Sequence, residues 1–151
     1  MLISDLIQEN NLMAHLEAKD RPEAHRKMLE HLVEKGVIQK DLLSISQKAL
    51  QAREEKMTTA MGGGFAIPHA TVPKLDKLVT LFARCPTGIN CEAVDSKLVK
   101  LFFLILVPSD QAQAHLQTLA TVAKFFNRRG VKTKILEAKG TEEILAVFRS
   151  A

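Results

Sequence analysis

Two histidines, one arginine and a pair of threonines carry most of the chemistry this chain could perform. His69 follows a run of three glycines and a proline, and His115 stands early in a segment with helical periodicity. Arg53 closes an earlier helical segment, shortly before Thr58 and Thr59. A guanidinium beside imidazoles favours an anion over a cation, and its forked donors fit phosphate well. Two histidines without a well-placed carboxylate would make a poor metal site, so we expect none.

A neutral imidazole is a competent nucleophile near neutral pH, because its unperturbed pKa is about 6.5. Arginine and hydroxyl donors stabilise the charge on the oxygens of a phosphoryl group in transfer. A glycine-rich loop lets backbone N–H groups approach an anion, although no Gly-Lys-Ser/Thr follows here as in a Walker A loop. The residue types therefore suggest phosphoryl transfer through a histidine. The expected phosphate-binding residues are Thr58, Thr59, Gly62 and Gly64.

The flanking segments predict the elements that must position these residues. Strands are expected over 12–16, 65–67 and 79–83, and 99–107 is expected to be a central strand because it is apolar on both faces. Helices are expected between the cap Asp20 and the stop Gly36, and over 40–54, 111–126, 132–138 and 142–149. Ligands of α/β sheets bind at strand ends. Since His69 and His115 both follow expected strands, we expect them to share one edge.

The order of these elements predicts an α/β fold, a three-layer α/β/α sandwich around a mixed central β-sheet. The 151 residues suit one domain, expected over 1–151. Hydrophobic residues make up 46% of the chain and charged residues 25%, which excludes disordered and low-complexity classes.

Composition also excludes several functions. The N-terminus lacks the basic region of a secretory signal, and the longest apolar run, 101–107, is far shorter than the roughly 20 residues of a membrane span. Two cysteines do not make a disulfide framework. The net charge of +4 suits phosphorylated or acidic partners, while the absence of Trp and Tyr argues against a nucleic-acid stacking surface. We expect a cytoplasmic protein without membrane insertion or nucleic-acid binding.

The stretch GFAIPHATVPKL, which contains His69, resembles the active-site signature of the fructose/mannitol-type enzyme IIA domains of the bacterial phosphotransferase system. These domains include the nitrogen-regulatory enzyme IIA. The Arg53-Glu54 pair, Thr58-Thr59 before the glycines, and the run HLQTLA that begins at His115 match further features of the family. The segment INCEAVD, 89–95, follows the family's turn into the central strand, so the resemblance covers nearly the whole chain.

The resemblance implies that His69 accepts a phosphoryl group from the phosphohistidine of HPr or its nitrogen-branch paralogue. It implies that His115 supports this transfer, that Arg53 stabilises the phosphate, and that no cofactor takes part. The phosphate would pass to an enzyme IIB, or the phosphorylated state would act as a regulatory signal. A non-enzymatic regulatory binding module on the same fold is the alternative. The presence of His69, Arg53 and His115 together favours the phosphocarrier.

The chain departs from the family pattern at 58–62, where TTAMG replaces a Ser-Thr-Gly-Ile-Gly type of stretch, and at Ala70. Cys85-Pro86-Thr87 resembles the phosphocysteine loop of enzyme IIB domains. It stands between two expected strands, however, with no helix N-terminus to lower the pKa of the thiol. Cys85 is therefore expected to be a buried or edge thiol. Ordinary solvent or core-edge positions are expected for His15, His25 and His31.

Overall fold

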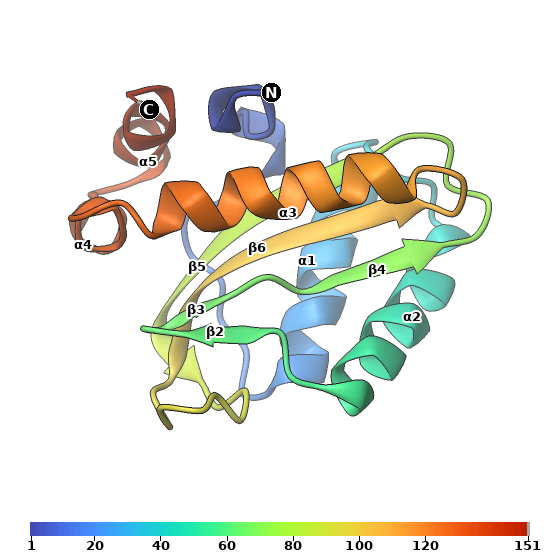
Figure 1. Ribbon diagram of the computed structural model, residues 1–151, viewed down its shortest axis with the longest axis horizontal. Helices are drawn as coiled ribbons and strands as arrows, with labels where there is room; N and C mark the ends of the chain where they lie inside the picture. The colour runs from blue at the N-terminus through green and yellow to red at the C-terminus, as the bar shows by residue number, and fades with distance from the viewer. Residues whose placement is uncertain (151) are drawn as a thin grey trace.

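A mixed sheet lies at the centre of the molecule, with helices on both of its faces (Figure 1). The computed structural model describes residues 1–150, with the side chains of 112–114 left out. The strands are β1 (Leu12–Met13), β2 (Ala60–Gly62), β3 (Phe65–Ala66), β4 (His69–Val72), β5 (Val79–Ile89) and β6 (Val99–Pro108). The helices are α1 (Arg21–Glu34), α2 (Leu42–Lys56), α3 (Ala112–Phe126), α4 (Val131–Glu137) and α5 (Thr141–Arg149), after the 3₁₀ turns η1 (Ile3–Asp5) and η2 (Glu9–Asn11).

The sheet has the strand order β1-β5-β6-β3-β2. Strand β4 pairs with the same central strand, β6, as β3 does, but nearer to the C-terminal end of β6. The pairs β1–β5, β3–β6 and β4–β6 are parallel, whereas β5–β6 and β2–β3 are antiparallel. The central strand β6 is buried along nearly its whole length, as its continuous apolar run predicts. It therefore receives helical cover on both faces.

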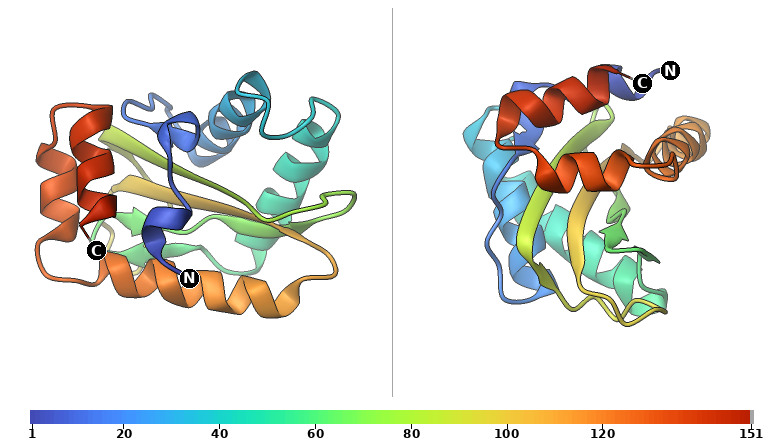
Figure 2. Two further views of the ribbon diagram at one scale, coloured as in Figure 1. Left: turned by 90° about the horizontal axis from the view of Figure 1, so that it is seen from above. Right: turned by 90° about the vertical axis from the view of Figure 1, so that its left-hand side faces the viewer.

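Two hydrophobic cores fill the spaces between the sheet and its helices. One joins residues of α1 and α2, such as Met28 and Leu50, to the inner face of β5 and β6. The other joins residues of α3, α4 and α5, such as Phe126 and Phe148, to the opposite face. Figure 2 shows these layers from two further directions, with the chain ends close together where α5 packs against η1. The prediction of a three-layer α/β/α sandwich is confirmed.

Local sequence signals account for the helix boundaries. The side chain of Asp20 accepts a hydrogen bond from the backbone N–H of Glu23, with Pro22 in the first turn of α1. Gly36 takes a φ of +73° just after that helix, a conformation that glycine adopts without strain. The predicted cap and stop of the first helix are thus confirmed.

The strand predictions need four corrections. The strand expected over 65–67 is followed by a second strand, β4, which begins at His69 itself and pairs with β6. Pro68 separates the two because it has no N–H for the ladder. Strand β5 extends to Ile89, past the expected end at 83, with a register shift after Arg84. The strand expected over 12–16 is limited to Leu12–Met13, and the short strand β2 was not expected.

In the part of the chain that is described, no helix combines the length and the apolar character needed to cross a membrane.

Candidate functional site

His69 stands at the point where the chain enters β4, beside Ile105 on the central strand. Its ring is half-buried, and Nδ1 lies 2.6 Å from the carbonyl oxygen of Ile67. Because a carbonyl oxygen only accepts hydrogen bonds, Nδ1 must carry the proton. A neutral ring with this hydrogen bond keeps the lone pair on Nε2.

His115 lies in the first turn of α3, the helix that follows β6. Its ring centroid is 5.2 Å from that of His69, and the two ring planes are tilted by 49°. Its Nδ1 is buried and has no hydrogen-bond partner among the described side chains. The two histidines thus lie side by side, as expected, although His69 begins β4 and pairs with Ile105 rather than following a strand.

Arg53 joins the histidine pair from the last turn of α2. Its Nη1 donates to the carbonyl oxygen of Met57 at 2.7 Å. Burial lowers the pKa of His69 most, and the charge of Arg53 and the proximity of His115 lower it further. The hydrogen bond to Ile67 and the negative charge of Glu54 act in the opposite direction. Burial and the charge of Arg53 also lower the pKa of His115. Both imidazoles are therefore neutral near pH 7, beside a fixed positive charge.

The two threonines bond to neighbours that the sequence did not pair with them. Thr58 Oγ1 donates to the carbonyl oxygen of Cys91 at 2.6 Å. Thr59 is 5% exposed, and both its N–H and its hydroxyl donate to the Glu54 carboxylate. The hydroxyl of Thr59 is therefore already bonded within the fold, and it does not face the histidine pair as a free donor.

The glycine run lies beside a different part of the central strand β6 than His69 does. The carbonyl oxygen of Gly64 accepts from the N–H groups of Lys100 and Leu101, whereas His69 pairs with Ile105. Four residues of strand separate these levels, or about 13 Å at roughly 3.3 Å per residue. The structure therefore does not bring Gly62 and Gly64 to His69, because β3 carries the chain away from the glycine turn.

A buried polar cluster beneath Thr58 and Thr59 is the feature that sequence reasoning missed. Arg21 Nη1 donates to Glu54 at 3.3 Å, and His25 Nε2 lies 3.9 Å from the same carboxylate. His25 is fully buried, so the expected solvent or core-edge position is wrong for it. Arg21 and His25 stand four residues apart on one face of α1, and this spacing was the available signal.

The remaining predicted side chains take ordinary positions. His15 is exposed beside Glu17, and His31 lies 3.1 Å from the carbonyl oxygen of Asn10. Cys85 is a buried thiol within β5, as expected. Cys91 is also a buried thiol, and burial raises its pKa to about 12. A reactive cysteine needs the opposite shift of its pKa.

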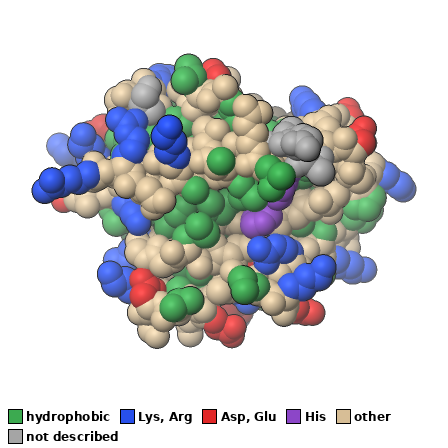
Figure 3. Space-filling model, in the orientation of Figure 1, with side chains coloured by type: hydrophobic (Ala, Val, Ile, Leu, Met, Phe, Trp, Pro, Cys, Tyr) green, Lys and Arg blue, Asp and Glu red, His purple; other side chains and the backbone are tan. Residues whose placement is uncertain are grey.

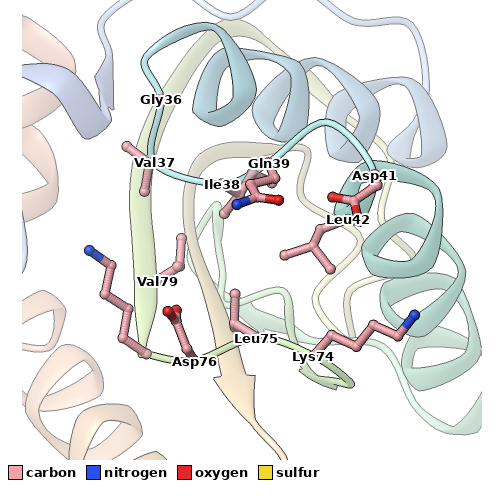
Figure 4. A pocket seen from close by; sticks show the side chains of 11 residues that line it. Gly36, Val37, Ile38, Gln39, Asp41, Leu42, Lys74, Leu75, Asp76 and Val79 are labelled. Carbon is pink, nitrogen blue, oxygen red and sulfur yellow. The ribbon is translucent and has the colours of Figure 1, made fainter.

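The surface around the histidine pair is apolar with basic neighbours. Figure 3 shows a hydrophobic strip beside the histidine atoms and Lys or Arg side chains next to them. Met57 and Leu116, neighbours of the site residues in the chain, are 70% and 63% exposed. A hollow of about 350 Å³ lies elsewhere, between the α1–α2 connection and the β4–β5 turn (Figure 4). Leu42, Leu75 and Asp76 line it, and no residue of the histidine site does.

This arrangement suits the transfer of an anionic group from one nucleophile to another. Nε2 of His69 has the lone pair, Arg53 supplies positive charge, and the positive N-terminal end of α3 lies beside His115. Within the described residues, no cluster of three or more His, Cys, Asp or Glu side chains could hold a metal ion.

Comparisons with known proteins agree with this chemistry. The family model for the phosphoenolpyruvate-dependent sugar phosphotransferase system, EIIA 2, matches residues 5–151. A nitrogen regulatory protein of Bradyrhizobium diazoefficiens is 32% identical over 152 residues, which cover 98% of this chain and 95% of the relative.

Two solved structures share the fold. The nitrogen regulatory protein IIA-Ntr of Neisseria meningitidis superimposes with a TM-score of 0.85 at 23% identity, covering 97% of this chain and 98% of the other. Enzyme IIA for mannitol from Escherichia coli, solved in complex with phosphorylated enzyme IIB, gives 0.77 at 19% identity, covering 96% and 98%. The extent of the family match, together with the full-length relative, shows that this chain belongs to the EIIA 2 family of the phosphoenolpyruvate-dependent sugar phosphotransferase system.

Proposed function

We propose that His69 is the residue on which this chain, a phosphocarrier by its family, carries the phosphoryl group. The observation that supports this most directly is the meeting of His69 and His115, with ring centroids 5.2 Å apart, beside the charge of Arg53. A carrier histidine must be neutral and must present a free lone pair. The lowered pKa and the Nδ1–H hydrogen bond to Ile67 meet both needs.

The transfer balances as a single displacement at phosphorus. The Nε2 lone pair of His69 forms the new N–P bond while the N–P bond of the donor phosphohistidine breaks. The donor imidazole takes the electron pair of the broken bond. Because Nδ1 of His69 keeps its proton, its phosphorylated ring gains positive charge, which the Ile67 carbonyl offsets through its hydrogen bond. Arg53 and His115 are proposed to stabilise the equatorial oxygens.

The proposed phosphoryl donor is HPr or its nitrogen-branch paralogue, in the cytoplasm. An enzyme IIB or a regulated target protein would receive the phosphate. The mannitol enzyme IIA of Escherichia coli was solved with phosphorylated enzyme IIB, which supports a protein partner of this kind. The exposed side chains Met57 and Leu116 beside the site give such a partner an apolar surface to cover. Docking there would exclude water from the transfer.

The test is phosphorylation of the full chain by enzyme I, HPr and phosphoenolpyruvate, followed by intact mass. The wild-type chain should gain one acid-labile phosphoryl group, and His69→Ala should gain none while remaining folded. His15→Ala is the matched control, because His15 is exposed and should not affect the gain. Phosphate retained on His69→Ala would contradict the assignment. A wild-type chain that gains no phosphate would favour the regulatory binding module.

A further inference from the structure

Glu54 has a carboxylate that is buried in the last turn of α2, next to Arg53. The residue is 5% exposed, and its two oxygens accept from the two donors of Thr59. The backbone N–H of Thr59 lies 2.8 Å from Oε1, and the hydroxyl bonds Oε2. Both bonds cross from the helix to the segment that leads into β2. Glu54 therefore fixes Thr59 in position and orientation.

Arg21 supplies the positive charge that this carboxylate needs. Its Nη1 lies 3.3 Å from Glu54 Oε1, 3.3 Å from Thr58 Oγ1 and 3.2 Å from the carbonyl oxygen of Cys91. Burial lowers the pKa of the adjacent His25 to about 4, so this imidazole is neutral near pH 7. The charge that faces Glu54 at hydrogen-bond distance thus comes from α1. A buried carboxylate is tolerated when it is paired and hydrogen-bonded in this way.

Two further hydrogen bonds connect Thr59 to the nucleophile. The carbonyl oxygen of Thr59 accepts from the N–H of Ile67 at 3.1 Å. The carbonyl oxygen of Ile67 accepts from Nδ1 of His69 at 2.6 Å. Ile67 is thus held on one side by Thr59 and holds His69 on the other. A continuous path of hydrogen bonds runs from Glu54 to the ring of His69.

We propose that Glu54 is a positioning residue, which acts through Thr59 and Ile67 to keep His69 protonated on Nδ1 and free on Nε2. The inference rests on the proposed function of His69 but concerns a residue that never touches the phosphate. It also assigns Thr59 a different role from the phosphate contact expected from sequence. Its hydroxyl holds the segment that leads into β2 against helix α2 through the hydrogen bond to Glu54.

The consequence for the reaction follows from the chemistry of imidazole. If the Ile67 carbonyl moves, His69 can adopt the tautomer with the proton on Nε2, which has no lone pair there to attack phosphorus. Removing the hydrogen-bonded partner behind a metal-ligating histidine lowers affinity or activity about 10- to 100-fold. We expect a loss of that size in the rate at which His69 takes up phosphate.

Glu54→Gln tests the proposal on the full chain. The amide oxygen still accepts from the N–H of Thr59, but the NH₂ can only donate, so the Thr59 hydroxyl must change from donor to acceptor. Arg21 also loses its charge partner. The ¹⁵N chemical shifts of the His69 ring in the unphosphorylated chain report the tautomer directly. Rapid-quench phosphorylation by phospho-HPr reports the rate. We expect a population of the Nε2–H tautomer and a rate lowered about 10- to 100-fold.

Substitutions at Thr59 separate positioning from folding should Glu54→Gln prove unstable. Thr59→Val keeps the shape but removes the hydroxyl and should shift the tautomer in the same direction. Thr59→Ser restores the hydroxyl and should restore the wild-type tautomer and rate. Thr80→Val is the matched control, because its buried hydroxyl donates to the carbonyl oxygen of Leu6 at 2.6 Å, two strands from His69. It should lower stability without changing the tautomer.

Unchanged ring shifts and an unchanged rate in Glu54→Gln and Thr59→Val, with lower stability alone, would overturn the proposal. The tautomer is measured without any phosphoryl transfer. A wild-type His69 that takes up no phosphate would therefore refute the proposed function, while the ring shifts would still decide the role of Glu54.

Discussion

The two faces of the sheet bury their side chains by different means. The face under α3, α4 and α5 is filled with phenylalanine rings, and Phe126 contacts five of them, with the closest centroid, that of Phe65, at 4.2 Å. The buried Arg84 on this side donates to backbone carbonyls of Ala14, Ile135 and Ala138. On this face, ring contacts and hydrogen bonds from Arg84 to backbone carbonyls, rather than ion pairs, hold the helices against the sheet.

The face under α1 and α2 buries ionisable groups against one another. Arg21, His25 and Glu54 meet there and reach the chain that leads to His69. Each face of the sheet therefore has its own role. The aromatic side anchors α3, which carries His115, while the polar side sets the orientation of His69. Stability and positioning can then be altered separately by changing one face or the other.

Phe126→Ala should produce the largest loss of stability. Truncation of a buried phenylalanine costs about 3–5 kcal/mol, and Phe126 is 1% exposed among the rings of Phe82, Phe103 and Phe148. Urea unfolding followed by circular dichroism measures this change. The folded fraction should still take up phosphate on His69. A stable variant that no longer accepts phosphate would show that the aromatic face also controls the chemistry.

His115→Ala should slow phosphoryl transfer without preventing phosphorylation. The second imidazole is proposed to stabilise the phosphoryl oxygens, and removing one such donor typically lowers a rate about 10²- to 10³-fold. Rapid-quench kinetics in both directions measures the effect. Thr121→Ala on the same helix is the control and should leave both rates unchanged. Wild-type rates in His115→Ala would return His115 to the role of an ordinary helix residue.

His25 should make the fold sensitive to acid. Its pKa is lowered from 6.5 to about 4 in the folded state, chiefly by burial. The unfolded chain therefore binds more protons in this range, and stability should fall as pH drops from 6.5 towards 4, by at most about 1.4 kcal/mol per pH unit.

Replacement by an uncharged side chain checks that dependence. Urea unfolding at several pH values should give a shallower slope for His25→Gln than for the wild type. His15→Gln, at an exposed position, should keep the wild-type dependence of the unfolding free energy on pH. An equal slope in His25→Gln and wild type would show that other groups account for the acid sensitivity.

Gly64→Ala should have the smallest effect. Gly64 has a φ of +79°, and a Cβ there would lie 3.4 Å from the carbonyl oxygen of Leu98. The left-handed conformation costs an L-residue about 1–2 kcal/mol, so stability should fall by that amount. The phosphorylation rate should not change, because the turn lies about 13 Å along β6 from His69. If the variant folds but takes up phosphate much more slowly, the turn contacts the phosphate after all, as expected from the sequence.

The sequence predicted the elements well where one local signal decided them. Asp20 and Gly36 marked the first helix, and the run 99–107 marked a central strand that is buried on both faces. The Pro-His step and the helical run at His115 located the two imidazoles that the fold brings together. These signals succeed because caps, periodicity and apolar runs act within a few residues.

The direction in which side chains point could not be predicted from such local signals. Thr58 and Thr59 were expected at the phosphate, yet both are bonded within the polar cluster. Gly62 and Gly64 are near His69 in the chain but lie at another level of the central strand. Which way a residue points depends on the partner strand and its register, and neither can be worked out from spacing.

The sequence by itself thus determined the order of the elements, the layered fold and the histidines that meet. The tertiary structure alone decided which residues support them. Arg21, His25 and Glu54 come from two helices, and the contacts that join them exist only once those helices pack. The pKa of His25 falls because tertiary packing removes it from water, a change that no local pattern of residues encodes.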